Sequence, residues 1–219
     1  PALYREYERV TGTPIDRRVV GYYTVAFLQL AVIGATFFMM PEIRGGNWIE
    51  GMLEKASITR RAYEAIAELH GLELDHDLTL PDPTPDSLEA SGLRKLIADI
   101  GRLPTSTAFA DWERDLLGAI PDFLLNYTRY RNWFETVSRT DIEAFLGDSF
   151  DDLAAADAAV QARIDTDDPA DDNELVRLMH RRMLRLSMIT AGTNPDETNP
   201  FFYILEPVID REPVSYTHL

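Results

Sequence analysis

The chain has 219 residues, 45% of them apolar, which suffices for one mid-sized domain or two small ones with a buried core. Its formal net charge is −16, from 37 acidic residues against 21 Lys and Arg, and such a surface disfavours nucleic acid as a partner. The absence of cysteine excludes a disulfide framework and a thiolate metal site, and it is compatible with a cytoplasmic protein.

Two helices are predicted at the start of the chain. The first covers Leu3 to Thr11, and Gly12 occupies the position of a C-terminal glycine cap. Asp16 is a suitable N-cap for the second helix, which begins near Val19.

The stretch from Val19 to Met40 contains no charged residue, so it is long and apolar enough for a membrane span. Gln29, Thr24 and Thr36 within it favour the other interpretation, a central helix of a soluble domain that is apolar all round. We adopt the soluble interpretation and expect other parts of a larger molecule to cover this helix.

Apolar residues at helical spacing predict a long amphipathic helix over Trp48 to His70. Pro81, Pro83 and Pro85 then alternate with polar residues, and proline restricts both its own backbone and that of its predecessor. We therefore predict a stiff linker over residues 75–86, dividing the chain into a part of residues 1–74 and a helical accessory part of residues 87–213.

The second part is also predicted to be helical, and no segment alternates apolar and polar residues as a strand would. Its expected helices are Leu88–Ile100, Ala108–Ile120, a helix that starts or kinks at Pro121, Asp141–Leu146, Phe150–Ile164, and Glu174–Thr190 with Asn173 as N-cap. The sequence thus predicts an all-α chain.

Three polar or aromatic sets in the second part each have a structural and a functional interpretation. An aromatic face (Phe123, Tyr127, Tyr130, Phe134) is typical of a core but could bind a partner. An arginine stripe (Arg177, Arg181, Arg185) could bind an anion or pair with acids. An acidic cluster (Asp165, Asp167, Asp168, Asp171, Asp172, Glu174) lacks the pattern of an EF-hand loop, so we expect a solvated loop rather than a calcium site.

The segment Tyr4-Arg5-Glu6-Tyr7-Glu8-Arg9-Val10-Thr11-Gly12-Thr13-Pro14-Ile15-Asp16 resembles one near the end of aminoglycoside phosphotransferase-like proteins, a superfamily that includes choline-kinase-like enzymes. The apolar helix with Tyr22-Tyr23-Thr24-Val25-Ala26-Phe27-Leu28 and the helix after it continue the resemblance to about Leu74. This implies that residues 1–74 are helices from the C-terminal end of a protein-kinase-like lobe.

The resemblance implies ATP and Mg²⁺ as cofactors of the complete protein and a small-molecule acceptor as its substrate. It carries no catalytic, cofactor-binding or metal-binding residue over to this chain, because His70-Gly71-Leu72 and His76-Asp77-Leu78 both lack the catalytic-loop pattern. It does imply that Tyr22, Tyr23 or Phe27 lines the acceptor pocket, whereas plain core packing explains the same residues.

Two hypotheses follow. The first is that the chain is the C-terminal fragment of an ATP-dependent phosphotransferase, inactive by itself and completed by an N-terminal part of its own protein. The second is a non-enzymatic helical interaction module. Residues 214–219 (Val214-Ser215-Tyr216-Thr217-His218-Leu219) match one reading frame of a transposon mosaic-end sequencing adapter, so we expect them to be an artefact of a metagenomic reading frame.

Overall fold

The computed structural model describes all residues except 1, 41, 43–47, 77, 86 and 192–219, and the regular elements within the described residues are all helices. They are α1 (Ala2–Thr11), α2 (Arg17–Phe38), α3 (Trp48–His70), α4 (Leu88–Gly101), α5 (Ala108–Leu146), α6 (Leu153–Ile164) and α7 (Asp172–Ala191). The all-α prediction is confirmed for this part of the chain. Gly45, Gly46, Asn47 and residues 192–219, including the suspected adapter sequence, lie outside it.

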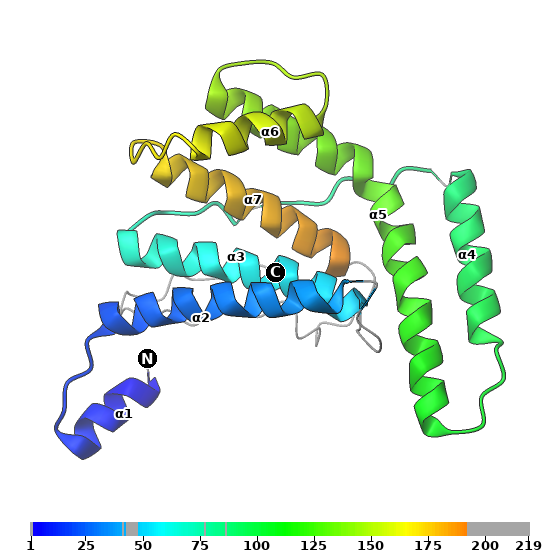
Figure 1. Cartoon of the computed structure of the whole chain (residues 1–219), viewed down its shortest axis with the longest axis horizontal. Helices are drawn as coiled ribbons and strands as arrows, with labels where there is room; N and C mark the ends of the chain where they lie inside the picture. The colour runs from blue at the N-terminus through cyan, green and yellow to red at the C-terminus, as the bar shows by residue number, and fades with distance from the viewer. Residues whose placement is uncertain (1, 41, 43–47, 77, 86, 192–219) are drawn as a thin grey trace.

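Helices α2 and α3 lie side by side as an antiparallel hairpin (Figure 1). The residues of α2 that are buried against α3 recur every seven positions, and they are Gly21, Leu28 and Ala35. On α3, Ala62 and Ala65 pack against Leu28, so small side chains let the two backbones approach closely.

Helix α2 is not buried on all sides as the soluble interpretation expects. Among the described helices, only α3 packs against it, so only a narrow stripe of its apolar surface is covered. It is also the one described helix that is long and apolar enough to cross a membrane. Asp16 caps its N-terminus as predicted, accepting hydrogen bonds from the backbone N–H groups of Arg18 and Val19 at 2.9 and 3.3 Å.

The fifth helix corrects the predicted division of the second part. The segments expected as separate helices from Ala108 to Leu146 form the single 39-residue α5, with Pro121 inside it. Pro121 has no backbone N–H group to donate to the preceding turn of the helix, but packing of the apolar residues on both sides of it keeps the chain helical. Figure 1 shows that α5 changes direction along its length.

The linker contributes to that bend. Thr84, which lies between two prolines, donates both its backbone N–H (3.1 Å) and its hydroxyl (2.9 Å) to the carbonyl oxygen of Arg129 within α5. A polar group that reaches into the helical ladder from outside is an ordinary cause of helix bending.

The first and last parts of α5 belong to different layers. Residues before the bend pair with α4 to form a helical hairpin at the right of Figure 1, which meets α3 where Phe123 packs against Trp48. The last turns of α5 pack with α6 and α7. Their shared core contains Ile142, Ala156, Val160 and Leu178. Helix α7 begins at Asp172, so Asn173 lies in its first turn and is not the predicted N-cap.

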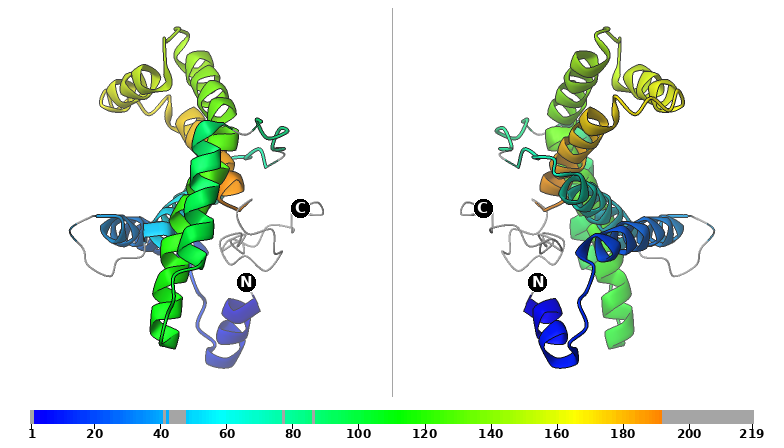
Figure 2. Two further views of the ribbon diagram at one scale, coloured as in Figure 1. Left: turned by 90° about the vertical axis from the view of Figure 1, so that its right-hand side faces the viewer. Right: turned by 90° about the vertical axis from the view of Figure 1, so that its left-hand side faces the viewer.

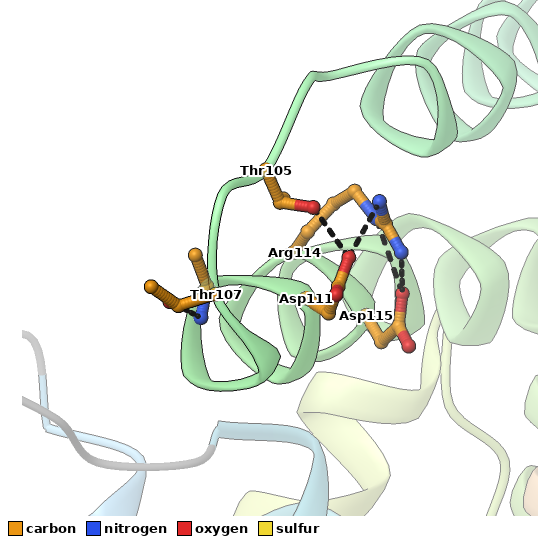
Figure 3. Close-up of polar contacts among 6 residues, drawn as sticks. Thr105, Thr107, Asp111, Arg114 and Asp115 are labelled. Atoms are coloured by element: carbon orange, nitrogen blue, oxygen red, sulfur yellow. Dashed lines mark hydrogen bonds and ion pairs between the residues drawn. The ribbon is translucent and has the colours of Figure 1, made fainter.

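A polar network closes the tip of the α4–α5 hairpin (Figure 3). Thr107 caps α5 by accepting a hydrogen bond from the N–H of Ala110, and the Thr105 hydroxyl donates to Asp111. Arg114 pairs with Asp111 and Asp115, each at 3.1 Å. The turn between the two helices is therefore fixed by side chains of its own.

Helix α7 lies against α3, so helices from before and after the proline-rich linker are in direct contact (Figure 1). The guanidinium of Arg177 also donates to the carbonyl oxygen of Glu73 at 3.3 Å. The division into residues 1–74 and 87–213 stays a prediction, and any motion of one part relative to the other would have to separate these contacts.

Candidate functional site

The residues predicted to line an acceptor pocket lie on the uncovered side of α2. Tyr22, Tyr23 and Phe27 are 52%, 73% and 70% exposed. Other large apolar residues of α2 are exposed with them, and these are Val19, Leu30, Ile33 and Phe37. The structure thus places the three predicted residues on an apolar surface of α2, not in the core.

The residues that carry the family resemblance contact one another around the α1–α2 turn. Gly12 adopts φ +67°, a left-handed conformation that favours glycine, and it ends α1. The Glu8 carboxylate accepts the backbone N–H of Ile15 at 2.8 Å and pairs with Arg17 at 2.9 Å. The Arg17 guanidinium in turn lies 4.8 Å from the centre of the Tyr4 ring.

We call these residues the α1–α2 lock: Tyr4, Glu8, Gly12, Ile15 and Arg17. Helix α1 packs against no other described helix, and both views of Figure 2 show it apart from them. Within the described residues, the lock therefore joins α1 to the start of α2.

The arginine stripe of α7 is paired with acids. Arg185, which is nearly buried, pairs with Asp141 of α5 at 2.7 Å, and Arg181 pairs with the same carboxylate at 3.4 Å. Arg177 pairs with Glu174 on its own helix. These contacts agree with the structural interpretation of the stripe, since each guanidinium already has a carboxylate.

The acidic cluster is also paired locally. Arg163 contacts Asp171 and, at 3.4 Å, Asp168, while Asp165 accepts a hydrogen bond from Gln161 at 2.8 Å. The aromatic face of α5 is largely interior, with Phe123 and Phe134 buried. Its rings pack in series along the helix and reach α3, with the rings of Phe123 and Trp48 5.6 Å apart.

A histidine and glutamate cluster joins three segments that are far apart in the sequence. Glu64 belongs to α3, His76 to the segment after α3, and His180 to α7. Their ligand atoms all lie within 4.8 Å of one another, and Glu64 Oε1 is 3.5 Å from His180 Nε2. The two imidazole rings meet edge to face with their centres 4.9 Å apart.

Burial and charge constrain this cluster. The His180 side chain is fully buried, and neither of its ring nitrogens has a hydrogen-bond partner within the described part of the chain. Arg60, also buried, brings its Nε to 3.2 Å from the same Glu64 oxygen. Burial lowers the pKa of His76 from its usual value, His180 and Arg60 lower it further, and Glu64 and Asp75 oppose the shift.

A pocket of about 350 Å³ lies between α3 and α7, with a mainly apolar lining. Tyr63 and Met179, which line it, are the chain neighbours of Glu64 and His180. Burial raises the pKa of the Tyr63 hydroxyl, so the phenol stays neutral in this wall. None of the three predicted residues of α2 lines this pocket.

Sequence reasoning did not find the cluster. The sequence places His76 in a segment that lacks the catalytic-loop pattern, and it assigns no role to His180. One local signal was present, because Ser57, Arg60 and Glu64 repeat at spacings of three and four and so share a face of α3. The approach of His180 depends on a contact across more than 100 residues, which no local spacing encodes.

Comparisons with known proteins give no relative from which to identify the chain. No protein-family model, no curated protein and no solved structure matches it.

Proposed function

We propose that this chain is the C-terminal part of an ATP-dependent small-molecule phosphotransferase of the aminoglycoside phosphotransferase-like type. The observation that carries the proposal is the α1–α2 lock. Tyr4, Glu8 and Gly12 belong to the resembling segment, and each has a definite structural task in the turn that follows it. A motif whose members depend on one another in this way is stronger support than the same letters scattered in a loop.

The outer surface of α2 supports the same proposal. A helix of a complete globular domain rarely presents so many large apolar side chains on one side, and such surfaces mark contacts with other protein parts or membranes. In the proposed protein, the remainder of the kinase-like lobe covers α1 and this side of α2. Tyr22, Tyr23 and Phe27 would then lie between the lobe and these helices, where one of them lines the acceptor pocket.

The proposed chemistry belongs to the rest of the protein. The nucleotide-binding lysine, the catalytic aspartate and asparagine, and the aspartate that holds Mg²⁺ would be supplied by the preceding part of the lobe. Within the proposal, this chain contributes the supporting helices and a side of the acceptor site. By itself it neither binds ATP nor transfers phosphate.

The test begins with the native gene. We expect the sequence before Pro1 to encode a nucleotide-binding lobe with a strand lysine and a His-x-Asp loop followed five residues later by Asn. The complete protein should release ADP when supplied with ATP, Mg²⁺ and a panel of amino-alcohol and hydroxylated acceptors. A native gene with no such lobe, or a complete protein that does not bind ATP, would refute the proposal.

The complete protein also tests the pocket residues individually. If Phe27 borders the acceptor, Phe27→Ala should raise the KM for the acceptor while leaving the KM for ATP unchanged. Leu30→Ala, on the same exposed side of α2, is the matched control. Equal effects of the two substitutions on both KM values would assign Phe27 to packing only.

A second candidate, a helical protein-interaction module, is favoured by the α4–α5 hairpin. Phe109 and Trp112 near its tip are 64% and 51% exposed, and Leu117 further along α5 is 55% exposed. The native gene separates the two candidates, since a start codon a few residues before Pro1 favours the module. The aromatic face and the arginine stripe are less suitable than this hairpin as a partner-binding surface, because the aromatic rings are packed and the arginines are paired with acids.

A further inference from the structure

Three segments with no sequence proximity bring a carboxylate and two imidazoles together at the α3–α7 contact. Glu64 and His180 come from the two facing helices, and His76 comes from the chain that leaves α3. One ligand atom from each of the three residues lies within 4.8 Å of the other two. These side chains are of types that ligate metal ions, and the place where they converge is largely buried.

The second observation is that His180 is fully buried with both ring nitrogens unpartnered: its side chain is 0% exposed, and neither Nδ1 nor Nε2 makes a hydrogen bond within the described residues. A buried polar group without a partner costs roughly 1–3 kcal/mol, which is why such groups in native proteins are nearly always satisfied. A ligand that accepts the imidazole lone pair would remove the part of that cost that falls on one of the two nitrogens.

The spacing fits a metal ion better than a hydrogen bond. Glu64 Oε1 lies 3.5 Å from His180 Nε2, at the outer limit for a hydrogen bond. Two ligands of a tetrahedral zinc ion, each bonded at about 2.0–2.1 Å, are separated by about 3.4 Å. Glu64 and His180 therefore already stand at the separation of two ligands on one ion, and the ligand atom of His76 lies within 4.8 Å of both.

The donor set selects a class of ion. Two imidazoles and one carboxylate suit first-row transition metals, whereas Ca²⁺ and Mg²⁺ prefer a shell made of oxygen. Two histidines and one glutamate also form a known zinc ligand set that leaves a fourth position for water or a small ligand.

The charges around the cluster must accommodate a dication. Among the charged groups that act on His76, the carboxylates of Glu64 and Asp75 outweigh the guanidinium of Arg60, and the two histidines add no charge when neutral. Arg60 opposes a metal because its Nε approaches the same Glu64 oxygen, at 3.2 Å. An ion bound there would weaken this pair, so removing the Arg60 charge should strengthen binding.

We propose that Glu64, His76 and His180 bind one divalent transition-metal ion, with Zn²⁺ as the expected occupant. The ion ties α7 to α3 and to the start of the proline-rich segment, so it fastens the second part of the chain to the first. The proposal does not depend on the phosphotransferase function, because it needs neither a nucleotide nor an acceptor.

The first experiment uses the full chain without a histidine tag, stripped of metal with a chelator and then dialysed. Titration with Co²⁺ should give visible absorption typical of a low-coordinate nitrogen and oxygen site, saturating at one ion per chain. Zn²⁺ should abolish that absorption at the same stoichiometry. Zn²⁺ should also raise the Tm of the stripped protein, since a ligand that binds only the folded state stabilises it.

Matched substitutions locate the site. The chain has four histidines, so the control carries His70→Gln and His218→Gln and keeps the two histidines of the cluster. We expect the control to bind Co²⁺ as the unaltered chain does. His76→Gln, at a half-buried position, should weaken binding about tenfold or more, as should Glu64→Gln.

Two further measurements keep the proposal open to refutation. Arg60→Met should bind Co²⁺ more tightly than the unaltered chain and should recover its Tm when Zn²⁺ is added. Loss of Co²⁺ binding in the control, or equal binding by His76→Gln and the unaltered chain, would place the ion elsewhere and refute the site. So would the absence of stoichiometric binding, which would leave the cluster as an internal ion pair.

Discussion

Gly21 in α2 faces Leu69 in α3 so closely that a β-carbon at Gly21 would lie 2.5 Å from Leu69 Cδ2 and 3.1 Å from its Cγ. The second turn of α2 thus packs against the last turn of α3 with no space for a methyl group at Gly21. Gly21→Ala should be less stable than Gly34→Ala by about 1–3 kcal/mol, because overpacking displaces Leu69. Urea unfolding of the two variants measures the difference.

Gly34 is the appropriate reference because a β-carbon there would meet nothing within 4 Å. Gly34→Ala itself should stabilise the protein by up to about 1 kcal/mol through the higher helix propensity of alanine. Equal stabilities of the two alanine variants would mean that Leu69 moves aside freely.

Glu8→Ala should release α1 by removing the carboxylate that accepts from Ile15 and pairs with Arg17. Two lost contacts of this kind amount to about 1–2 kcal/mol of local stability, or a factor of 5–30 in the open population. Trypsin cleavage after Arg17 should accelerate accordingly. Glu6→Ala, which removes only an exposed pair with Arg9, should leave the cleavage rate unchanged.

Asn126→Leu should destabilise the contact between α5 and α7. The buried Asn126 amide donates to the carbonyl oxygen of Ile189, which would be left without this donor. The expected loss is about 1–3 kcal/mol by chemical denaturation. Asn132→Leu, at an exposed position of the same helix, should change the free energy of unfolding by no more than about 0.5 kcal/mol.

Asp141→Asn should destabilise the chain more than any single exposed ion pair would. The Asp141 carboxylate pairs with Arg185, whose guanidinium is nearly buried, and with Arg181. Loss of the negative charge leaves a buried cation without its partner, for which we expect about 2–4 kcal/mol. Glu174→Gln, which breaks the exposed pair with Arg177, is the comparison and should stay within about 0.5 kcal/mol.

Asp122→Asn should make the protein more stable at neutral pH. Burial raises the pKa of the Asp122 carboxyl, with Arg129 opposing the shift, so the folded state favours the protonated form. The charged carboxylate therefore disfavours folding at pH 7, and this penalty fades as the pH falls through the folded-state pKa toward the unfolded value. Thermal unfolding should show a higher Tm for the variant at pH 7 and no difference near pH 3; a gain that persists in acid would contradict the assignment.

Local rules predicted the helices well because each one has a local cause. Asp16 caps the N-terminus of α2, and Gly12 ends α1 through its positive φ. Both residues are recognisable in the sequence as helix boundaries. Trp48 to His70 forms one helix as its apolar spacing predicts. Pro121 misled the prediction because the rule for proline considers the missing donor but not the packing of Phe123 and Phe134 beyond it.

The candidate site was much less predictable. No pattern near Glu64 in the sequence predicts that His180 lies beside it, because the two residues meet only when α7 packs against α3. The exposure of one face of α2 could not be predicted from composition either, because an apolar segment has the same composition whether one side or every side of the helix is covered. Tyr22, Tyr23 and Phe27 could be named from the resemblance, but their exposure could not.

The bend of α5 makes the α4–α5 hairpin a lever. Ala108 to Arg129 extends about 30 Å, since a helix rises 1.5 Å per residue. A change of about 10° at the bend would therefore move the tip by about 5 Å. Because Thr84 donates two hydrogen bonds to the Arg129 carbonyl oxygen, tension on the proline-rich segment would act on α5 at the bend. The position of Trp112, near the tip of the hairpin, would report the resulting movement.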